Sequence, residues 1–471
     1  MYQLKTFRTG AWIVSSLILL AACRKKDTDL QELDNLVNFE TTSQGIVPAD
    51  QHIQIKLKLS RAVTQEVPLI INVTTQGLEY GVQFTTSPAI ESGTITTSIP
   101  SGSNEAVVTV SKVPGAPFVG DEKLTMNIYS SGSPIIIGGT KEFTLSFAEL
   151  IATTGTATMD GGGQFYTNKV FVDLSANRST SVNRNTWDLG FYSGADYRVT
   201  LNSSLAMMAK QIDKNDLTQV TAVDTVGFGA EVAFSQTNPR STQMPYIDHP
   251  SGDLTRTAIA EVAANAADNK VYIINRGLTP GATPATRGWK KIRVIRNSTG
   301  GYTLQHADIA SATFQEINIA KDADYFFRYA SFETGALTVE PPALKWDIAW
   351  TYFANSVNFG GGDVPYLYQD IIIQNRNVQV AKVTVAPGGV TFSSFNETNL
   401  AGLTFSTSQT TIGADWRAGG GPSSAPVAHT DRFYVVKDGE GNIYKLRFTG
   451  LTNAGGERGY PSYEMALVKE G

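Results

Sequence analysis

The chain has 471 residues, which is too long for one ordinary domain, and 41% of them are hydrophobic, enough to build buried cores. Its formal net charge of −5 argues against nucleic acid as a partner, because nucleic-acid-binding proteins need a basic surface. The sequence has four histidines and no His-Glu-x-x-His, Gly-x-Ser-x-Gly or Cys-x-x-Cys motif, so we expect that the protein is not an enzyme.

The first residues have the parts of a bacterial export signal. Lys5 and Arg8 supply positive charge, and residues 11–22 form an apolar run that is shorter than the roughly 20 residues needed to span a bilayer. The run ends in Leu20-Ala21-Ala22-Cys23, which resembles the lipobox of bacterial lipoproteins. Cys23 is the only cysteine, which favours this interpretation over an ordinary secretory signal. We predict that residues 1–22 are removed and that Cys23 is lipidated.

The residues that follow the lipobox are mostly charged and polar. Residues 23–38 are therefore predicted to be a tether between the lipid and the first folded domain. Acidic residues shortly after Arg24-Lys25-Lys26 resemble a surface-export tag of Bacteroidetes lipoproteins. We expect a protein that is lipid-anchored in the outer membrane and exposed at the cell surface, while a periplasmic orientation remains the alternative.

Residues 39–150 consist of short segments in which apolar and polar residues alternate. His52–Leu59, for example, places four aliphatic side chains on one face and polar side chains on the other. Such strands, separated by turn residues, predict an immunoglobulin-like β-sandwich. Leu78–Phe84 and the turns at 100–102 and 120–122 resemble the Calx-beta domain family, but its acidic calcium ligands are mostly missing. We interpret this domain as a spacer.

The rest of the chain has an internal repeat. Three landmarks recur in the same order and at nearly the same offset, which predicts two strand-rich copies at residues 155–315 and 316–471. The paired landmarks are Trp187–Phe191 with Trp346–Trp350, Lys270–Ile274 with Arg432–Val436, and Lys291–Val294 with Lys445–Phe448. The predicted fold is therefore all-β, with an N-terminal β-sandwich followed by two tandem β-domains.

The second copy resembles the HmuY family of Bacteroidetes lipoproteins, and the first copy is more divergent. The motifs that carry the resemblance are Phe327–Gly335, Trp346–Ala349, Trp416, Phe433–Asn442 and Lys445–Thr449. The resemblance implies an all-β fold. For the founding members it also implies capture of haem at the cell surface and its delivery to an outer-membrane transporter.

Family members that bind haem hold its iron between two axial histidines or methionines on two loops. One of these loops corresponds to Arg417–Pro422, directly after Trp416, and it contains neither residue type. The other loop should lie between Ile373 and Phe395, where histidine and methionine are also absent. The resemblance therefore predicts haem as the ligand, while the second copy lacks the axial ligands.

Haem iron still needs two good donors, so the first copy supplies the remaining candidates. Met244 and His249 share a loop near the place of one family ligand loop, although a loop histidine in a polar turn is the simpler alternative. Met207 and Met208 are adjacent, so in a strand only one could face a pocket, and core packing is their alternative role. His429 is the candidate in the second copy.

Two functions remain open at this point. The first is a surface lipoprotein that captures a ligand, with haem as the expected ligand, an outer-membrane transporter as a partner, and weak or absent haem binding. The second is a non-catalytic structural or adhesive surface protein without haem. A haem titration of residues 24–471 distinguishes them.

Overall fold

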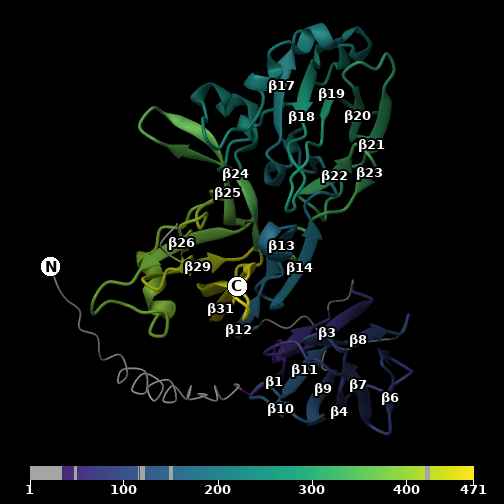
Figure 1. Ribbon diagram of the computed structural model, residues 1–471, viewed down its shortest axis with the longest axis vertical. Coiled ribbons are helices and arrows are strands. Elements are labelled where there is room, and N and C mark those ends of the chain that lie inside the picture. The colour runs from purple at the N-terminus through teal and green to yellow at the C-terminus, as the bar shows by residue number, and fades with distance from the viewer. Residues whose placement is uncertain (1–33, 47–49, 115, 117–121, 148–151, 420–424) are drawn as a thin grey trace, which may run out of the picture.

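The computed structural model describes residues 34–46, 50–114, 116, 122–147, 152–419 and 425–471. These residues form an all-β protein with short helical turns, which confirms the predicted fold class (Figure 1). Cys23 and the signal segment lie outside the described residues. Within the described part, no helix is long and apolar enough to cross a membrane.

The N-terminal part is a β-sandwich of two sheets around one core. Sheet A has the order β10-β1-β3-β8-β5 and sheet B the order β2-β11-β9-β4-β7-β6. The strands of sheet A are β1 (Leu36–Phe39), β3 (His52–Leu59), β5 (Phe84–Ser87), β8 (Glu105–Lys112) and β10 (Ile136–Ile137). Those of sheet B are β2 (Ser43–Gly45), β4 (Val67–Gln76), β6 (Ile90–Glu91), β7 (Thr94–Ile99), β9 (Lys123–Ser131) and β11 (Glu142–Ser146). β1 begins inside the range predicted as tether.

The remainder contains four larger sheets, here called C, D, E and F. Sheet C contains β12 (Thr154–Thr158), β31 (Arg458–Lys469), β30 (Ile443–Thr452), β29 (Arg432–Lys437) and β26 (Gln379–Thr384) in this order. Sheet D contains β14 (Arg178–Asn183), β13 (Asn168–Asp173), β24 (Ile348–Asn358) and β25 (Asp363–Gln374). Sheet E contains β16 (Val199–Leu201), β15 (Leu189–Tyr192), β22 (Phe327–Ser331) and β23 (Gly335–Leu337). Sheet F contains β17 (Met208–Ile212), β18 (Val271–Asn275), β19 (Trp289–Arg296), β20 (Tyr302–Asp308) and β21 (Gln315–Ile319).

Short elements connect or cover these sheets. β27 (Arg417–Ala418) and β28 (Val427–Ala428) pair with each other. The helical turns are η1 (Gly163–Phe165), η2 (Ser203–Leu205), η3 (Leu217–Gln219), η4 (Ala222–Thr225), α1 (Phe228–Glu231), η5 (Ser241–Tyr246), η6 (Leu254–Arg256), η7 (Ala266–Asp268) and η8 (Glu397–Gly402).

Shared cores show that the four sheets form consecutive layers in the order F, E, D, C. One core joins sheets F and E, a second joins E and D, and a third joins D and C. Alternation along the strands makes this possible, because neighbouring side chains point to opposite faces. In β13, for example, Val170 and Val172 pack toward sheet C while Phe171 packs toward sheet E. The central strands of the inner sheets E and D are therefore mostly buried on both faces.

The pairing of strands does not follow the two predicted repeat ranges. β12 and β13, from the first range, pair with β31 and β24 in the second. Conversely, the first strands of the second range, β21 and β22, pair with β20 and β15 of the first range. The order β12-β31-β30-β29-β26 in sheet C thus matches β21-β20-β19-β18-β17 in sheet F. The strands of the two ranges are interleaved, so neither range forms a sheet system of its own.

Candidate functional site

A cavity lies in the central layer, between sheets E and D. Its volume is about 110 Å³. Its inner wall comes from β13, β22, the segment after β23 and the residues before β15 and β24, and all of its side chains there are buried except the half-buried Phe327. Its outer end is formed by residues that include exposed Asp253 and Arg376. The lining residues used below are Lys169, Trp187, His249, Tyr329, Glu340 and Trp346.

Lys169 brings a positive charge into this layer. It occupies the strand face that also carries Phe171, so its side chain points toward sheet E and is only 8% exposed. Its Nζ lies 4.7 Å from the ring centroid of Phe171 and 5.9 Å from that of Trp346. None of the hydrogen bonds or ion pairs found among the described residues involves this Nζ. Burial lowers the pKa of Lys169 to about 8, against the opposing effect of Glu340.

Glu340 is the buried acid on the same cavity. One carboxylate oxygen accepts a hydrogen bond of 2.8 Å from the backbone N–H of Phe327, and the other accepts one of 2.8 Å from the Tyr329 hydroxyl. Burial raises the pKa of Glu340 to about 7, because these bonds and Lys169 offset only part of the desolvation. Glu340 and Lys169 do not form an ion pair within 4.0 Å. The Lys169 ammonium therefore has no direct counter-ion in this cavity.

Two tryptophans from corresponding places in the repeat also line the cavity. Trp187 precedes β15 and Trp346 precedes β24, and each is 5% exposed. Trp187 packs edge-to-face on Tyr329 at 4.9 Å and 74°, and Trp346 packs on Phe171 at 5.0 Å and 76°. The Nε1 donors of both indoles are buried and have no partner in the described part of the chain. A buried donor without a partner costs about 1–3 kcal/mol, so such groups point to a bound water or ligand.

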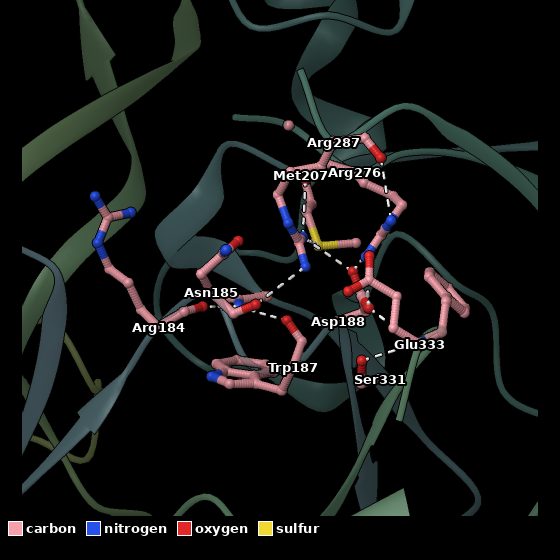
Figure 2. Close-up of polar contacts among 12 residues, drawn as sticks. Arg184, Asn185, Trp187, Asp188, Met207, Arg276, Arg287, Ser331 and Glu333 are labelled. Carbon is pink, nitrogen blue, oxygen red and sulfur yellow. Dashed lines mark hydrogen bonds and ion pairs between the residues drawn. The ribbon is translucent and has the colours of Figure 1, made fainter. Parts of the chain in front are cut away.

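The aspartates that follow these tryptophans have different surroundings. Asp188 is fully buried and binds Arg276 through both carboxylate oxygens, at 3.0 and 3.1 Å, and Arg287 at 2.9 Å (Figure 2). Asp347 accepts a 2.7 Å hydrogen bond from the Leu174 N–H, but no arginine binds it among the described residues. Burial raises the pKa of Asp347 well above its usual range, and nearby acids led by Asp173 raise it further. Through these bonds, each aspartate holds the backbone next to its cavity tryptophan, Trp187 or Trp346, in place.

His249 stands at the outer part of the cavity wall. Its Nδ1 lies 2.8 Å from the Ser251 hydroxyl oxygen, and its pKa is lowered by burial and by Arg256. The preceding Asp248 anchors this loop, since its carboxylate accepts hydrogen bonds from the Leu201 and Ala258 N–H groups at 2.7 and 3.0 Å. Burial raises the pKa of Asp248 to about 6.

The other residues predicted for haem lie elsewhere. Met207 is buried in the core between sheets F and E, and Met208 in the core on the outer face of sheet F, as expected for adjacent positions entering a strand. Met244 lies on η5 and packs against that same outer core. His429 follows β28, where its N–H donates to the Trp416 carbonyl at 2.8 Å. The structure therefore brings only His249 to the cavity, and the haem ligands remain a prediction.

Sequence reasoning missed Lys169 and Glu340. A signal for Lys169 was present, because a lysine stands on one face of a strand whose neighbours are valine and phenylalanine. No comparable signal marks Glu340, which comes near Lys169 only because sheets E and D stack on each other. Among the described residues, no group of three or more His, Cys, Asp or Glu side chains is placed to hold a metal ion. The site offers binding by hydrogen bonds, charge and aromatic surfaces.

Solved structures with similar chains include three of note. A HmuY-like heme binding protein from Bacteroides vulgatus is 12% identical over 68% of this chain and 93% of its own, with a TM-score of 0.16. A lipoprotein from Bacteroides fragilis has the same identity and coverage and a TM-score of 0.15. The apo CBD1 domain of Calx is 10% identical over 24% of this chain and 96% of its own, with a TM-score of 0.21. These TM-scores are too low to say more about this chain.

The comparison with curated proteins found no match. The family model described as "HmuY protein" matches residues 165–465, which include sheets D to F, all of sheet C except β12 and the end of β31, and the cavity between sheets E and D. This match covers more than half of the sequence and extends through both predicted copies. The chain therefore belongs to the HmuY family.

Proposed function

We propose that this protein captures a small ligand at the cell surface and holds it in the cavity between sheets E and D. The observation that carries the proposal is the buried Lys169 ammonium, which faces this cavity without a direct counter-ion. A charge of this kind is costly unless something pairs with it. Ligand capture also agrees with membership of the HmuY family and with the expected absence of an enzyme activity.

Haem is the ligand that the family resemblance suggests, and the geometry does not favour it. Haem iron needs two donors on opposite sides, whereas His249 is the only predicted donor at the cavity. A volume of about 110 Å³ is also below the roughly 300–1,000 Å³ typical of pockets for drug-sized ligands. We expect haem, if it binds, to bind weakly at the His249 end.

A titration with haemin tests this expectation. Residues 24–471 should give at most a weak Soret shift, and His249→Ala should abolish it, while Met208→Leu serves as a control that leaves the cavity unchanged. A tight low-spin complex that survives His249→Ala and Met244→Ala would show that haem binds elsewhere. Loss of a tight complex in His429→Ala would move the haem site to the second copy.

We propose that Cys23 carries the lipid and anchors the protein in the outer membrane with its folded part outside. The motivation is the lipobox, followed by a polar tether. Cys23→Ala should abolish palmitate labelling and release the protein from the membrane fraction. A matched Thr28→Ala variant in the tether should keep both. Full membrane retention and normal processing of Cys23→Ala would contradict lipid anchoring.

The repeat and the N-terminal sandwich complete the proposal. We infer that residues 155–315 and 316–471 are two copies that exchange their first three strands, because sheets C and F have matching strand orders and sheets D and E do as well. The Calx-beta-like sandwich would then act as a spacer between the anchor and the family domain. An outer-membrane transporter is the partner we propose for the captured ligand.

A further inference from the structure

The cavity between sheets E and D is lined by more hydrogen-bond donors than the acceptors around it can pair. Lys169 contributes up to three N–H donors and the two indoles one each. The two indole N–H groups have no partner within the described residues. The Lys169 Nζ faces the Phe171 and Trp346 rings, and no hydrogen bond or ion pair found in that part of the chain involves it. The Glu340 carboxylate is the nearby buried acceptor, and it already receives the Tyr329 hydroxyl and the Phe327 N–H. A ligand that fits this cavity should therefore bring oxygen acceptors and negative charge.

We propose that the ligand is a small organic carboxylate, whose carboxylate group binds Lys169 and whose body lies against the aromatic walls. This inference rests on the proposed capture function and names its ligand class. A carboxylate supplies two acceptor oxygens and the charge that a buried ammonium lacks, and such charge-assisted hydrogen bonds are among the strongest in proteins. The rings of Phe327, Tyr329 and Trp346 give the remainder of the ligand apolar surface.

The size of the cavity limits the ligand. An apolar cavity of about 150 Å³ in another protein binds benzene. The present cavity, at about 110 Å³, is smaller, but exposed residues form its outer end, so a ligand as large as benzoate can place its carboxylate inside and extend beyond that end. Its outer end carries Arg376, which is exposed and could attract an anion toward the entrance. Benzoate and acetate are therefore suitable probes, and benzamide is a neutral probe of the same shape as benzoate.

The titratable groups around the cavity should make the affinity for a carboxylate depend on pH. Lys169 projects from β13, Tyr329 from β22 and Glu340 from the segment after β23, while Asp248, His249, Asp253 and Arg376 form the outer part. As the pH rises from 6 to 9, Glu340 ionises and Lys169 loses its proton, because their pKa values are about 7 and about 8. Both changes oppose an anion, so carboxylate binding should weaken over this range.

The test is calorimetric titration of residues 24–471 with benzoate, acetate and benzamide at pH 6 and pH 9. Benzoate should bind more tightly than benzamide and lose affinity at the higher pH. Lys169→Met, which keeps an apolar stem in the layer, should weaken benzoate binding at least about tenfold. Lys437→Met removes an exposed lysine from β29 and should change nothing.

The contrary outcomes separate this inference from the proposed function. Benzoate binding that Lys169→Met leaves unchanged would overturn the carboxylate site. If benzamide binds as tightly as benzoate and Trp187→Phe weakens both, the cavity captures ligands but not as carboxylates. If none of the three probes binds, the carboxylate class is wrong. If, in addition, a crystal structure shows only water in the cavity, the capture function loses its support as well.

Discussion

Replacing Asp188 by asparagine should lower the free energy of unfolding by about 3–5 kcal/mol, as expected when one partner of a buried ion pair is removed. Asp188 is fully buried between two arginines and also accepts the Phe332 N–H at 3.0 Å (Figure 2). Without its charge, Arg276 keeps the exposed Glu333 as its acidic partner, and Arg287 keeps only neutral partners. Two buried positive charges would then lie side by side with one exposed carboxylate between them.

Tryptophan fluorescence during urea unfolding can measure this loss. After removal of the signal segment, every tryptophan lies between Trp187 and Trp416, so the emission reports on sheets C to F and not on the N-terminal sandwich. Glu333→Gln is the matched control, because its carboxylate binds Arg276 at 3.0 Å but is 69% exposed. The Glu333→Gln variant should lower the free energy of unfolding by less than about 1 kcal/mol. Equal losses in the two variants would contradict the role assigned to Asp188.

The same substitution at the corresponding place in the repeat should have the opposite effect. Asp347→Asn should raise the midpoint of thermal unfolding at pH 8, with a gain on the order of 1–3 kcal/mol, since it removes an unpaired buried charge. An asparagine can still accept the Leu174 N–H that Asp347 binds at 2.7 Å. Asp173 and Asp438, which raise the pKa of Asp347, would lose a repelling neighbour.

The pH dependence follows from the direction of the shift. Because the pKa of Asp347 is higher in the folded protein than its ordinary 3.8, the folded state holds the proton to a higher pH. Asp347 therefore costs no stability below pH 4 and costs progressively more as the pH rises through its folded pKa. The difference between Asp347→Asn and the wild type should be large at pH 8 and small at pH 4. A variant that is less stable at pH 8 would show that the Asp347 carboxylate is paired.

The strands could be predicted from the sequence, but their partners could not. Alternation identified His52–Leu59 as a strand with one buried face, and the structure gives the same bounds for β3. Alternation also reports which face of a strand is buried, as with Met207 and Met208 on opposite sides of sheet F. It does not report which strand lies alongside. The pairing of β13 with β24 joins residues far apart in the chain, so the interleaved sheets were not predicted.

The candidate site was harder to predict for the same reason. The tryptophans of the two Trp-Asp motifs were identified by repetition, and His249 by its residue type. The chemistry of the cavity depends on Lys169 and Glu340, which meet only because sheets E and D are stacked. The family resemblance directed attention to axial ligands for haem, whereas the cavity presents a buried ammonium without a counter-ion and two indole donors without partners.

The central claim is that the cavity between sheets E and D binds a carboxylate ligand at Lys169. The most direct test is a crystal structure of residues 24–471 with 4-bromobenzoate, in which anomalous scattering locates the bromine. We predict one bromine site at the outer end of the cavity, with the carboxylate within hydrogen-bond distance of the Lys169 Nζ, and no such site in Lys169→Met crystals. A cavity that contains only water, with bromine bound elsewhere or nowhere, would contradict the claim.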